Sequence, residues 1–376
     1  MPDAASNAQP ANLPEVREDL RGMHPYGAPQ LDVDHPLNVN ENPFGPTREL
    51  AEDLGRAVAE AATDLNRYPD REFWDLRRDL ATYLAEESDI RLLEPEQVWA
   101  ANGSNEIMHQ LLLAFGGPGR SVLGFAPHYS MYPEYARDTF TSFVAGDRGP
   151  APDFTLDADA VVTAIAQHRP DIVLLTSPNN PTGTALDLDV VIAAAQALAA
   201  HRGLLIVDEA YAEFRRDGVP SALQLLDQHP NLVVTRTMSK AFALAGARVG
   251  YMAAHRSLID AVRIVRLPYH LSAITQAVAR TALRHRDILL GRVAELRQER
   301  DALAAHLRER GHDVADSDAN FILFHPFRAR RAVFDALLER GILVREVGPD
   351  PWLRVSIGTA DDNAAFRTAL EEADPR

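Results

Sequence analysis

Short apolar segments alternate with helix-like segments along residues 98–250, and this alternation restricts the fold more than any other feature of the sequence. Four segments have the length and the Val, Ile and Leu content of buried strands, namely residues 121–125, 172–176, 204–207 and 232–235. Helical stretches such as 186–201 separate them. Strands that alternate with helices in this way form a mainly parallel sheet with helices on both faces. The sequence therefore predicts an α/β protein.

A different pattern flanks this region. Two helices are predicted before it, over residues 48–63 and 71–87, and a long helix is predicted after it, over 284–310. A strand–helix–strand pattern over 320–358 indicates a smaller α+β domain. We therefore expect an N-terminal arm (1–35), a large domain (36–280) and a small C-terminal domain (281–376).

The composition excludes several classes of function. A formal net charge of −16 argues against broad binding to nucleic acid or anionic membranes, since both need a basic surface. The chain has no cysteine, which excludes disulfides and thiolate metal sites and is consistent with a cytoplasmic location. No apolar run has the length of a membrane span. No zinc-site spacing links His24, His109, His128 and His270, so no metal is expected.

Polar residues follow three of the predicted strands. Asn179 and Asn180 come after one strand, Asp208 after the next, and Ser239-Lys240 after a third. Functional residues on a parallel sheet collect at the carboxyl ends of the strands. We therefore expect these side chains to meet at one edge of the sheet.

Lys240 is the only lysine among the 38 lysine and arginine residues. An arginine guanidinium stays charged in proteins, so it cannot do work that requires an amine to lose its proton. A lysine amine can be brought towards neutrality by burial and can then form a Schiff base with a carbonyl. Retention of this one lysine by chance is the alternative, but its neighbours are the residues that cofactor chemistry needs.

The residues around the predicted strand ends suit a pyridine cofactor. Asp208 is either a helix N-cap or an anionic partner that keeps a pyridine nitrogen protonated. Tyr211 is either a core tyrosine or a hydroxyl that reaches the cofactor's phenolic oxygen, and the Asn180 amide could donate to the same oxygen. Tyr129 could cover the ring.

A phosphate site is predicted where residues 102–106 precede an apolar helical stretch, because the free N–H groups of a helix N-terminus favour an anion. Arg248 would add a charged donor, and Thr237 and Ser239 would add hydroxyl donors.

Four motifs in this order resemble the pyridoxal-phosphate aminotransferases of fold type I, classes I and II: Asn-Pro-Thr-Gly, Asp-Glu-Ala-Tyr, Ser-Lys-Ala-Phe and Gly-Ala-Arg-Val-Gly. The resemblance covers residues 37–369 and implies a seven-stranded sheet between helices. It implies that Lys240 carries the cofactor, that Asp208 pairs with the pyridinium, and that Asn180 and Tyr211 contact the phenolate oxygen. The phosphate ligands that it implies are Ser104, Asn105, Thr237, Ser239 and Arg248, with Tyr68 reaching the phosphate of a neighbouring subunit in a homodimer.

Further segments resemble the histidinol-phosphate aminotransferases of actinobacterial type. They include Pro25-Tyr26-Gly27, residues 37–43, Arg67-Tyr68-Pro69, residues 267–272 and residues 352–358. This resemblance implies that Arg354 binds the carboxylate of glutamate or 2-oxoglutarate. The other substrate-binding residues expected from it are Tyr26, Asn42, Tyr269 and Arg345, of which Arg345 is either a ligand of the substrate phosphate or a surface cation.

Three other functions stay open at this point. An aromatic amino-acid aminotransferase shares most of these motifs, and a threonine-phosphate decarboxylase uses a related scaffold. A non-catalytic regulator that binds the cofactor is the third, although every catalytic position is filled.

Overall fold

The computed structural model describes residues 14–375, and its contacts divide the chain into two compact units, Met1–Gln30 and Leu31–Arg376. The described part of the first unit, residues 14–30, contains a short 3₁₀ turn at Glu18–Leu20. The first thirteen residues of the predicted arm lie outside the described residues. The division of the second unit into a large domain (36–280) and a small domain (281–376) stays a prediction.

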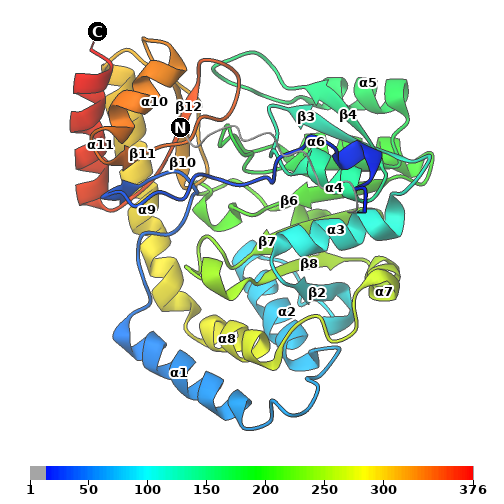
Figure 1. The fold of residues 1–376 in the computed structure, drawn as a ribbon. Helices are drawn as coiled ribbons and strands as arrows, with labels where there is room; N and C mark the ends of the chain where they lie inside the picture. Colours follow the sequence, from blue (N-terminus) through cyan, green and yellow to red (C-terminus); the bar gives the residue numbers. More distant parts are fainter. Residues whose placement is uncertain (1–13, 376) are drawn as a thin grey trace. The chain divides into compact units, whose positions relative to one another are not determined.

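A seven-stranded sheet forms the centre of the second unit, as expected (Figure 1). Its strand order is β2-β8-β7-β6-β5-β3-β4. Neighbouring strands are parallel from β7 to β4, and only β8 runs antiparallel to its two neighbours. The strands are β2 Val98–Ala101, β3 Ser121–Ala126, β4 Ser142–Asp147, β5 Ile172–Thr176, β6 Leu204–Asp208, β7 Leu232–Thr237 and β8 Gly250–Ala254.

Every residue of β5, β6, β7 and β8 is buried, whichever face its side chain points to. Both faces of the sheet are therefore covered, as in other parallel sheets flanked by helices. The helices of the described chain are α1 Arg48–Ala62, α2 Trp74–Ser88, α3 Ser104–Phe115, α4 Tyr132–Asp138, α5 Ala158–His168, α6 Leu188–Ala199, α7 Arg256–Val265, α8 Ala273–Arg284, α9 Arg286–Glu309, α10 Arg330–Leu338 and α11 Ala360–Ala373. Within residues 14–375, no helix has both the length and the apolar character that a membrane crossing requires.

The C-terminal region has its own small sheet, which confirms the expected α+β pattern. Strand β10 (Phe321–His325) lies between β12 (Leu353–Ser356) and β9 (Asp313–Val314), antiparallel to both. The long helix α9 links α8 to this region and lies against β10 (Figure 1). Separately, β1 (His35–Pro36) pairs in parallel with β11 (Ile342–Leu343), so the chain that enters the central fold is attached to the C-terminal region.

Helix α2 begins three residues later than the sequence suggests. Asp70 accepts hydrogen bonds from the backbone N–H groups of Glu72 (3.0 Å) and Trp74 (3.0 Å), so residues 70–73 form a turn before the helix. Phe73 has a left-handed backbone (φ 40°) that ends this turn. The aspartate therefore competes for the N–H groups of the first predicted helical turn.

Candidate active site

Asp208 ends β6 and is buried at the carboxyl edge of the sheet. Its carboxylate accepts hydrogen bonds from the Tyr132 hydroxyl (3.1 Å), the Thr235 hydroxyl (3.2 Å) and the Ala210 N–H (3.2 Å). Burial raises the pKa of Asp208 to about 6, although these three donors oppose the shift. No cation pairs with Asp208 in the described chain, so its charge is held by neutral donors.

Tyr211 lies three residues further on, and its hydroxyl meets two amides. The Asn180 side chain donates to it at 3.2 Å and the Asn40 side chain at 3.0 Å. The ring packs edge-on against Phe321, with 5.1 Å between centroids. The structure therefore brings together Tyr211 and Asn180, as expected, and adds Asn40.

Lys240 follows β7 and its amine points towards the same edge. Its Nζ donates to the Val39 carbonyl at 2.9 Å and lies 5.9 Å from the Tyr211 ring centroid. Burial, with a smaller contribution from the Arg354 charge, lowers the pKa of Lys240 to about 8. A substantial fraction of this amine is therefore neutral at mildly alkaline pH, which a nucleophile requires.

A cradle for an anion lies where α3 begins. Gly103 precedes the helix with φ +85°, and a Cβ there would come within 2.5 Å of the Arg248 guanidinium. A Cβ on Gly250 would collide with the Ser104 backbone nitrogen. Arg248 also donates to the Ser239 hydroxyl at 3.3 Å, and Ser239 lies 3.0 Å from Thr237. Backbone donors, two hydroxyls and a guanidinium thus surround one place at a helix N-terminus.

Two arginines stand side by side next to this site. Arg354 is buried, and it donates to the Asn180 carbonyl oxygen at 2.6 Å and to the Asn38 backbone carbonyl at 2.9 Å. Arg345 and Arg354 form an antiparallel bridge with backbone hydrogen bonds of 2.9 and 3.0 Å. Directly opposed residues of such a pair extend their side chains from the same face. The two side chains therefore leave this backbone bridge on the same face.

The other predicted residues are placed as follows. Asn105 is exposed in the first turn of α3, and Tyr129 is half-buried against Tyr132 with 5.6 Å between ring centroids. Asn42 donates to the Ala241 carbonyl at 3.3 Å, which holds the segment before α1 next to Lys240.

Tyr68 and Tyr269 lie together at the surface. Tyr68 is 79% exposed and stacks on Tyr269, with 4.4 Å between centroids. Tyr26 belongs to the first unit, so its role in substrate binding stays a prediction.

The sequence did not identify Asn40, Tyr132 or Thr235 as site residues. Thr235 stands two residues before the predicted Thr237 on one strand, so strand alternation places both side chains on one face and could have indicated it. Tyr132 is 76 positions from its partner Asp208 in the sequence, and Asn40 is 171 positions from Tyr211. Local sequence patterns do not reveal contacts between residues so far apart.

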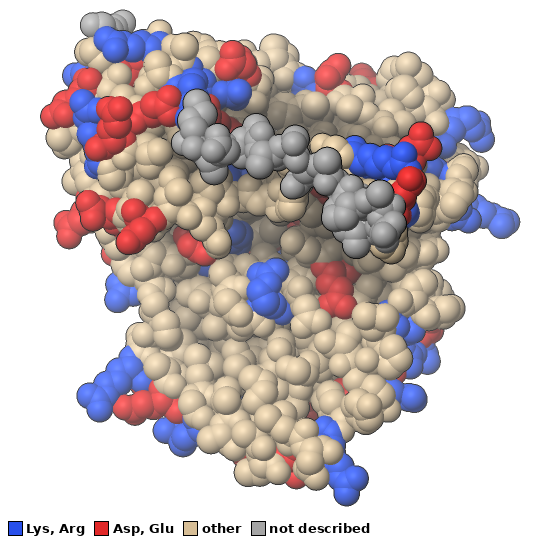
Figure 2. Space-filling model, viewed as in Figure 1, with Lys and Arg blue, Asp and Glu red and all other residues tan. Residues whose placement is uncertain are grey.

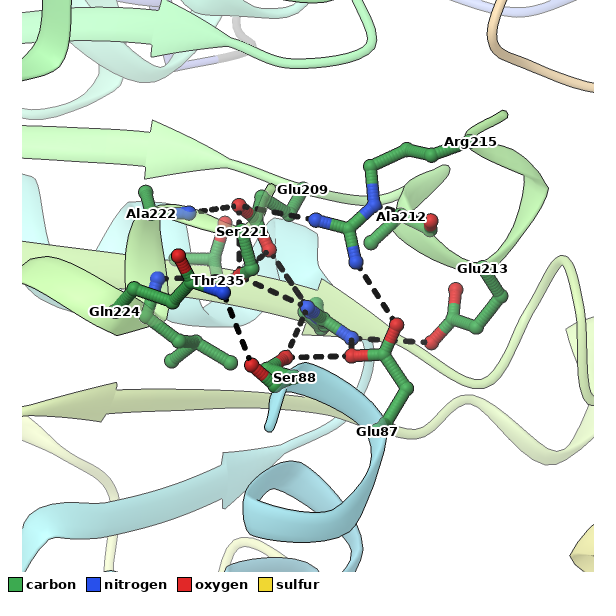
Figure 3. A network of polar contacts seen from close by, with 12 residues as sticks. Glu87, Ser88, Glu209, Ala212, Glu213, Arg215, Ser221, Ala222, Gln224 and Thr235 are labelled. Atoms are coloured by element: carbon green, nitrogen blue, oxygen red, sulfur yellow. Dashed lines mark hydrogen bonds and ion pairs between the residues drawn. The ribbon is translucent and has the colours of Figure 1, made fainter. Parts of the chain in front are cut away.

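A second buried polar cluster includes Glu209, the residue that follows Asp208 (Figure 3). Arg236, on β7, donates to Glu209 at 3.0 and 2.8 Å and also bonds Glu87, and Arg215 donates to Glu87 at 2.9 Å. Burial opposes the ionisation of Glu87, but Arg236 and Arg215 outweigh it and lower its pKa to about 2. Because Glu209 follows Asp208, this cluster holds the chain that carries Asp208 and Tyr211.

Comparison with known proteins agrees with this geometry. Residues 35–370 match the family model described as aminotransferase class I and II. The chain belongs to this family. Its relatives include the histidinol-phosphate aminotransferase of Thermobifida fusca, 59% identical over 96% of each chain, and that of Mycolicibacterium smegmatis, 51% identical over 96% of this chain and 94% of the relative.

A solved structure supports the same assignment. The histidinol-phosphate aminotransferase of Sinorhizobium meliloti, in complex with pyridoxal 5'-phosphate, has a TM-score of 0.79, with 25% identity over 91% of each chain. The protein is thus a pyridoxal-phosphate-dependent aminotransferase with the fold type I architecture.

The residues present fit this cofactor. The anion cradle at α3 suits a phosphate, the buried Asp208 suits a protonated ring nitrogen, and the Lys240 amine suits a bond to the carbonyl carbon. The absence of side chains at Gly103 and Gly250 allows Arg248 and the helix N-terminus to approach each other. A bulkier residue at either glycine would close the cradle.

Proposed function

We propose that the protein transfers an amino group between glutamate and imidazole acetol phosphate, and so forms histidinol phosphate for histidine biosynthesis. The observation that carries the proposal is the pair of arginines on one face beside Lys240. Arg354 is buried and donates to Asn180, while Arg345 is half-buried. One arginine can then bind the α-carboxylate of glutamate in one half-reaction, and the other can bind the substrate phosphate in the second half-reaction. The relatives at 51–59% identity, which are named histidinol-phosphate aminotransferases, support the same substrates.

The residues of the chain have separate tasks in this reaction. Bound pyridoxal phosphate supplies a protonated ring that accepts electrons from the substrate Cα. Asp208 keeps the ring nitrogen protonated, since its carboxylate is held at fixed distances by Tyr132, Thr235 and Ala210. Once its Nζ is free and neutral, Lys240 would take the proton from the substrate Cα as a general base and deliver it as a general acid to the C4′ carbon of the cofactor. Tyr211 and Asn180, which are hydrogen-bonded to each other, would hold the ring's phenolic oxygen.

Binding of the two substrates requires different arginine contacts. The planar guanidinium of Arg354 can pair with a carboxylate through two parallel hydrogen bonds. Histidinol phosphate has no α-carboxylate, so its phosphate needs a cation at another position, and Arg345, bridged to Arg354, is a candidate. We therefore assign the α-carboxylate of glutamate to Arg354 and the phosphate of the second substrate to Arg345.

A homodimer with shared sites is part of the proposal. Large apolar side chains are exposed beside the stacked pair Tyr68–Tyr269, among them Leu65, Ile264 and Leu267, which are 55%, 84% and 72% exposed. The lower part of the surface in Figure 2, which includes α1 and α8, carries mainly uncharged side chains. Exposed apolar side chains such as Leu65, Ile264 and Leu267 are typical of a protein interface. In a dimer Tyr68 would reach the partner's phosphate, as the family resemblance implies. A cytoplasmic location also stays a proposal.

The experiment that tests this function is a stopped-flow assay of the cofactor-loaded enzyme. The enzyme is mixed separately with glutamate, histidinol phosphate and phenylalanine, and conversion of the cofactor to its amino form is followed by absorbance. We expect glutamate and histidinol phosphate to convert it at far lower concentrations than phenylalanine. Efficient conversion by phenylalanine, without conversion by histidinol phosphate, would assign an aromatic aminotransferase instead. Release of carbon dioxide from threonine phosphate would assign a decarboxylase.

A variant tests the role of Arg345 in the same assay. Arg345→Gln should raise the concentration of histidinol phosphate that half-saturates the reaction about 10- to 100-fold, the cost of losing a charge-assisted hydrogen bond. The half-saturating concentration of glutamate should stay nearly unchanged. Equal effects on both substrates would contradict the assignment of the phosphate to Arg345.

A further inference from the structure

The hydroxyl of Tyr211 is surrounded by donors whose orientation the structure fixes. Arg354 can only donate hydrogen bonds, and its Nη1 lies 2.6 Å from the Asn180 side-chain oxygen. The NH₂ group of Asn180 must therefore be the end that lies 3.2 Å from the Tyr211 hydroxyl. The Tyr211 oxygen accepts this hydrogen bond and is not its donor.

Asn40 approaches the same oxygen from the other side. The backbone N–H of Asn40 donates to the Ser356 hydroxyl at 2.8 Å, and that hydroxyl in turn donates to the Asn40 side-chain oxygen at 3.0 Å. The NH₂ group of Asn40 then donates to Tyr211 at 3.0 Å. Asn40 and Ser356 are both buried, so this arrangement is shielded from water.

Two amide donors leave one direction for the proton of Tyr211. A phenol oxygen has two lone pairs and one hydrogen, and here both lone pairs are used. The proton is therefore left for an acceptor other than the two amides, and a cofactor bound to Lys240, whose Nζ lies 5.9 Å from the Tyr211 ring centroid, would supply one in its phenolic oxygen. Ser356 belongs to β12, the strand that also carries Arg354. Asn40 therefore joins the Tyr211 hydroxyl to the strand that carries Arg354.

We propose that Asn40 is a positioning residue: it directs the proton of the Tyr211 hydroxyl into the cofactor site and couples that hydroxyl to the strand of Arg354. The proposal rests on the proposed function only in that the cofactor ring lies beside Tyr211. It does not depend on which amino acid or phosphate the enzyme accepts.

A purely structural explanation of Asn40 makes a different prediction. Asn40 has a left-handed backbone (φ 56°), which asparagine and glycine tolerate better than other residues. Its backbone carbonyl also accepts a hydrogen bond from Asn320 at 3.1 Å. Asn40→Gly keeps this backbone and its hydrogen bonds and removes only the side chain. If the residue serves the backbone alone, this variant should behave as the wild type.

The test is the pH titration of the visible absorbance of the cofactor-loaded enzyme without substrate. A donor at the phenolic oxygen stabilises its negative charge, so loss of that donor should raise the pH at which the bound cofactor loses its proton. We expect Asn40→Gly to raise the midpoint by about 0.5–1 pH unit, the effect of one hydrogen bond. Tyr211→Phe should raise it further. Ser356→Ala should cause a smaller shift in the same direction, because Asn40 keeps its amide but loses its orienting partner.

The double variant decides how Asn40 acts. If Asn40 works through Tyr211, adding Asn40→Gly to Tyr211→Phe should leave the midpoint where Tyr211→Phe alone places it. An unchanged midpoint in the single variant would overturn the proposal, as would a further shift of equal size in the double variant. Asn363→Ala is the matched control, since Asn363 is a buried asparagine with its own hydrogen bonds outside the site, and it should lower stability without moving the midpoint.

The outcome is independent of the substrate assignment. If histidinol phosphate fails to react while the titration behaves as expected, the proposed function is wrong and the role of Asn40 stands. If histidinol phosphate reacts and the titration of Asn40→Gly matches the wild type, only the role of Asn40 is wrong.

Discussion

Two buried polar clusters lie at the ends of β6 and β7. They differ in whether their ionisable groups are paired with an opposite charge. Arg236, behind the sheet edge, is fully buried between Glu209 and Glu87, and these carboxylates raise its pKa although burial opposes this. On the other side, Asp208 has only neutral donors, and the amine of Lys240 donates to a carbonyl oxygen. Two neighbouring residues therefore differ. The charge of Glu209 is balanced by that of Arg236, whereas Asp208 has no cationic partner in the described chain.

This difference distinguishes the cluster that stabilises the fold from the cluster that is suited to catalysis. A buried group that is paired with an opposite charge is stabilised in its ionised form and does not readily gain or lose a proton. An unpaired buried group has a pKa shifted towards neutral pH, which is what acid–base and nucleophilic chemistry require. The pKa values of about 6 for Asp208 and about 8 for Lys240 show this state before any cofactor binds. A cofactor with a cationic nitrogen and a carbonyl would supply the missing partners of both groups.

The largest effect is expected at Lys240. Lys240→Arg keeps a positive charge but removes an amine that can lose its proton, so transamination should fall by about 10⁴-fold or more. Rates of the half-reaction with glutamate would measure this. Lys240→Ala is the companion variant, because a small amine added to the solution should restore part of its rate and none of the rate of Lys240→Arg. Near-normal turnover by Lys240→Arg would show that the unpaired amine is not the reacting group.

The paired cluster should respond in stability. Arg236→Met leaves Glu209 and Glu87 buried without their main partner, which should lower the free energy of unfolding by about 3–5 kcal/mol. Denaturant unfolding of the cofactor-free protein would measure it. Arg91→Met is the matched control, since the Arg91–Asp227 pair is about half exposed and should cost only ~0–1 kcal/mol. Equal costs at the two arginines would remove the distinction between the clusters.

The sequence predicted the unpaired cluster better than the paired one. Asp208, Asn180 and Lys240 each follow an apolar strand, and the parallel order of the strands brings their ends together. Period and strand length are local properties, so the sheet and the site edge could be inferred from the chain. The composition of the chain also singled out Lys240, because it is the only lysine in the sequence.

The paired cluster depends on contacts that have no local signal. Arg236 lies inside a strand that is otherwise apolar or bears hydroxyls, and its partner Glu87 is 149 positions away at the end of α2. Asn40 has the same difficulty, because its partner Tyr211 comes from another region of the chain. Pairing across such distances is set by the packing of helices on the sheet, which a single sequence does not contain. The start of α2 was misplaced for a local reason, the turn formed by Asp70.

The two clusters also predict opposite effects for neighbouring carboxylates. The unfolded pKa of an aspartate is about 3.9, and that of folded Asp208 is about 6, so the folded state binds this proton more tightly. Stability is therefore lost as the pH rises through this interval, and on the order of 2–3 kcal/mol is missing above pH 6. Asp208→Asn should raise the unfolding free energy of the cofactor-free protein at pH 8 by about 1–3 kcal/mol, and the gain should disappear below about pH 4.

Glu209→Gln gives the contrasting result one residue away. Its charge pairs with the buried Arg236, so its removal should lower the unfolding free energy at the same pH. Urea unfolding of both variants at pH 4 and pH 8 would measure the pair. A loss of stability in both at pH 8 would show that Asp208 is compensated as well as Glu209 is.

The smallest predicted effect concerns the arginine that joins the unpaired cluster to the substrate. Arg354→Lys keeps a charge but loses the planar pair of donors, one of which holds the Asn180 oxygen at 2.6 Å. The KM for glutamate should rise about 10- to 100-fold, the cost of one charge-assisted hydrogen bond, and kcat should fall less. Steady-state rates at several glutamate concentrations would separate the two parameters. Arg345→Lys provides the control, since it should change the KM for histidinol phosphate more than that for glutamate. If kcat falls with an unchanged KM, Arg354 serves mainly to orient Asn180 and Tyr211, and the carboxylate binds to another cation.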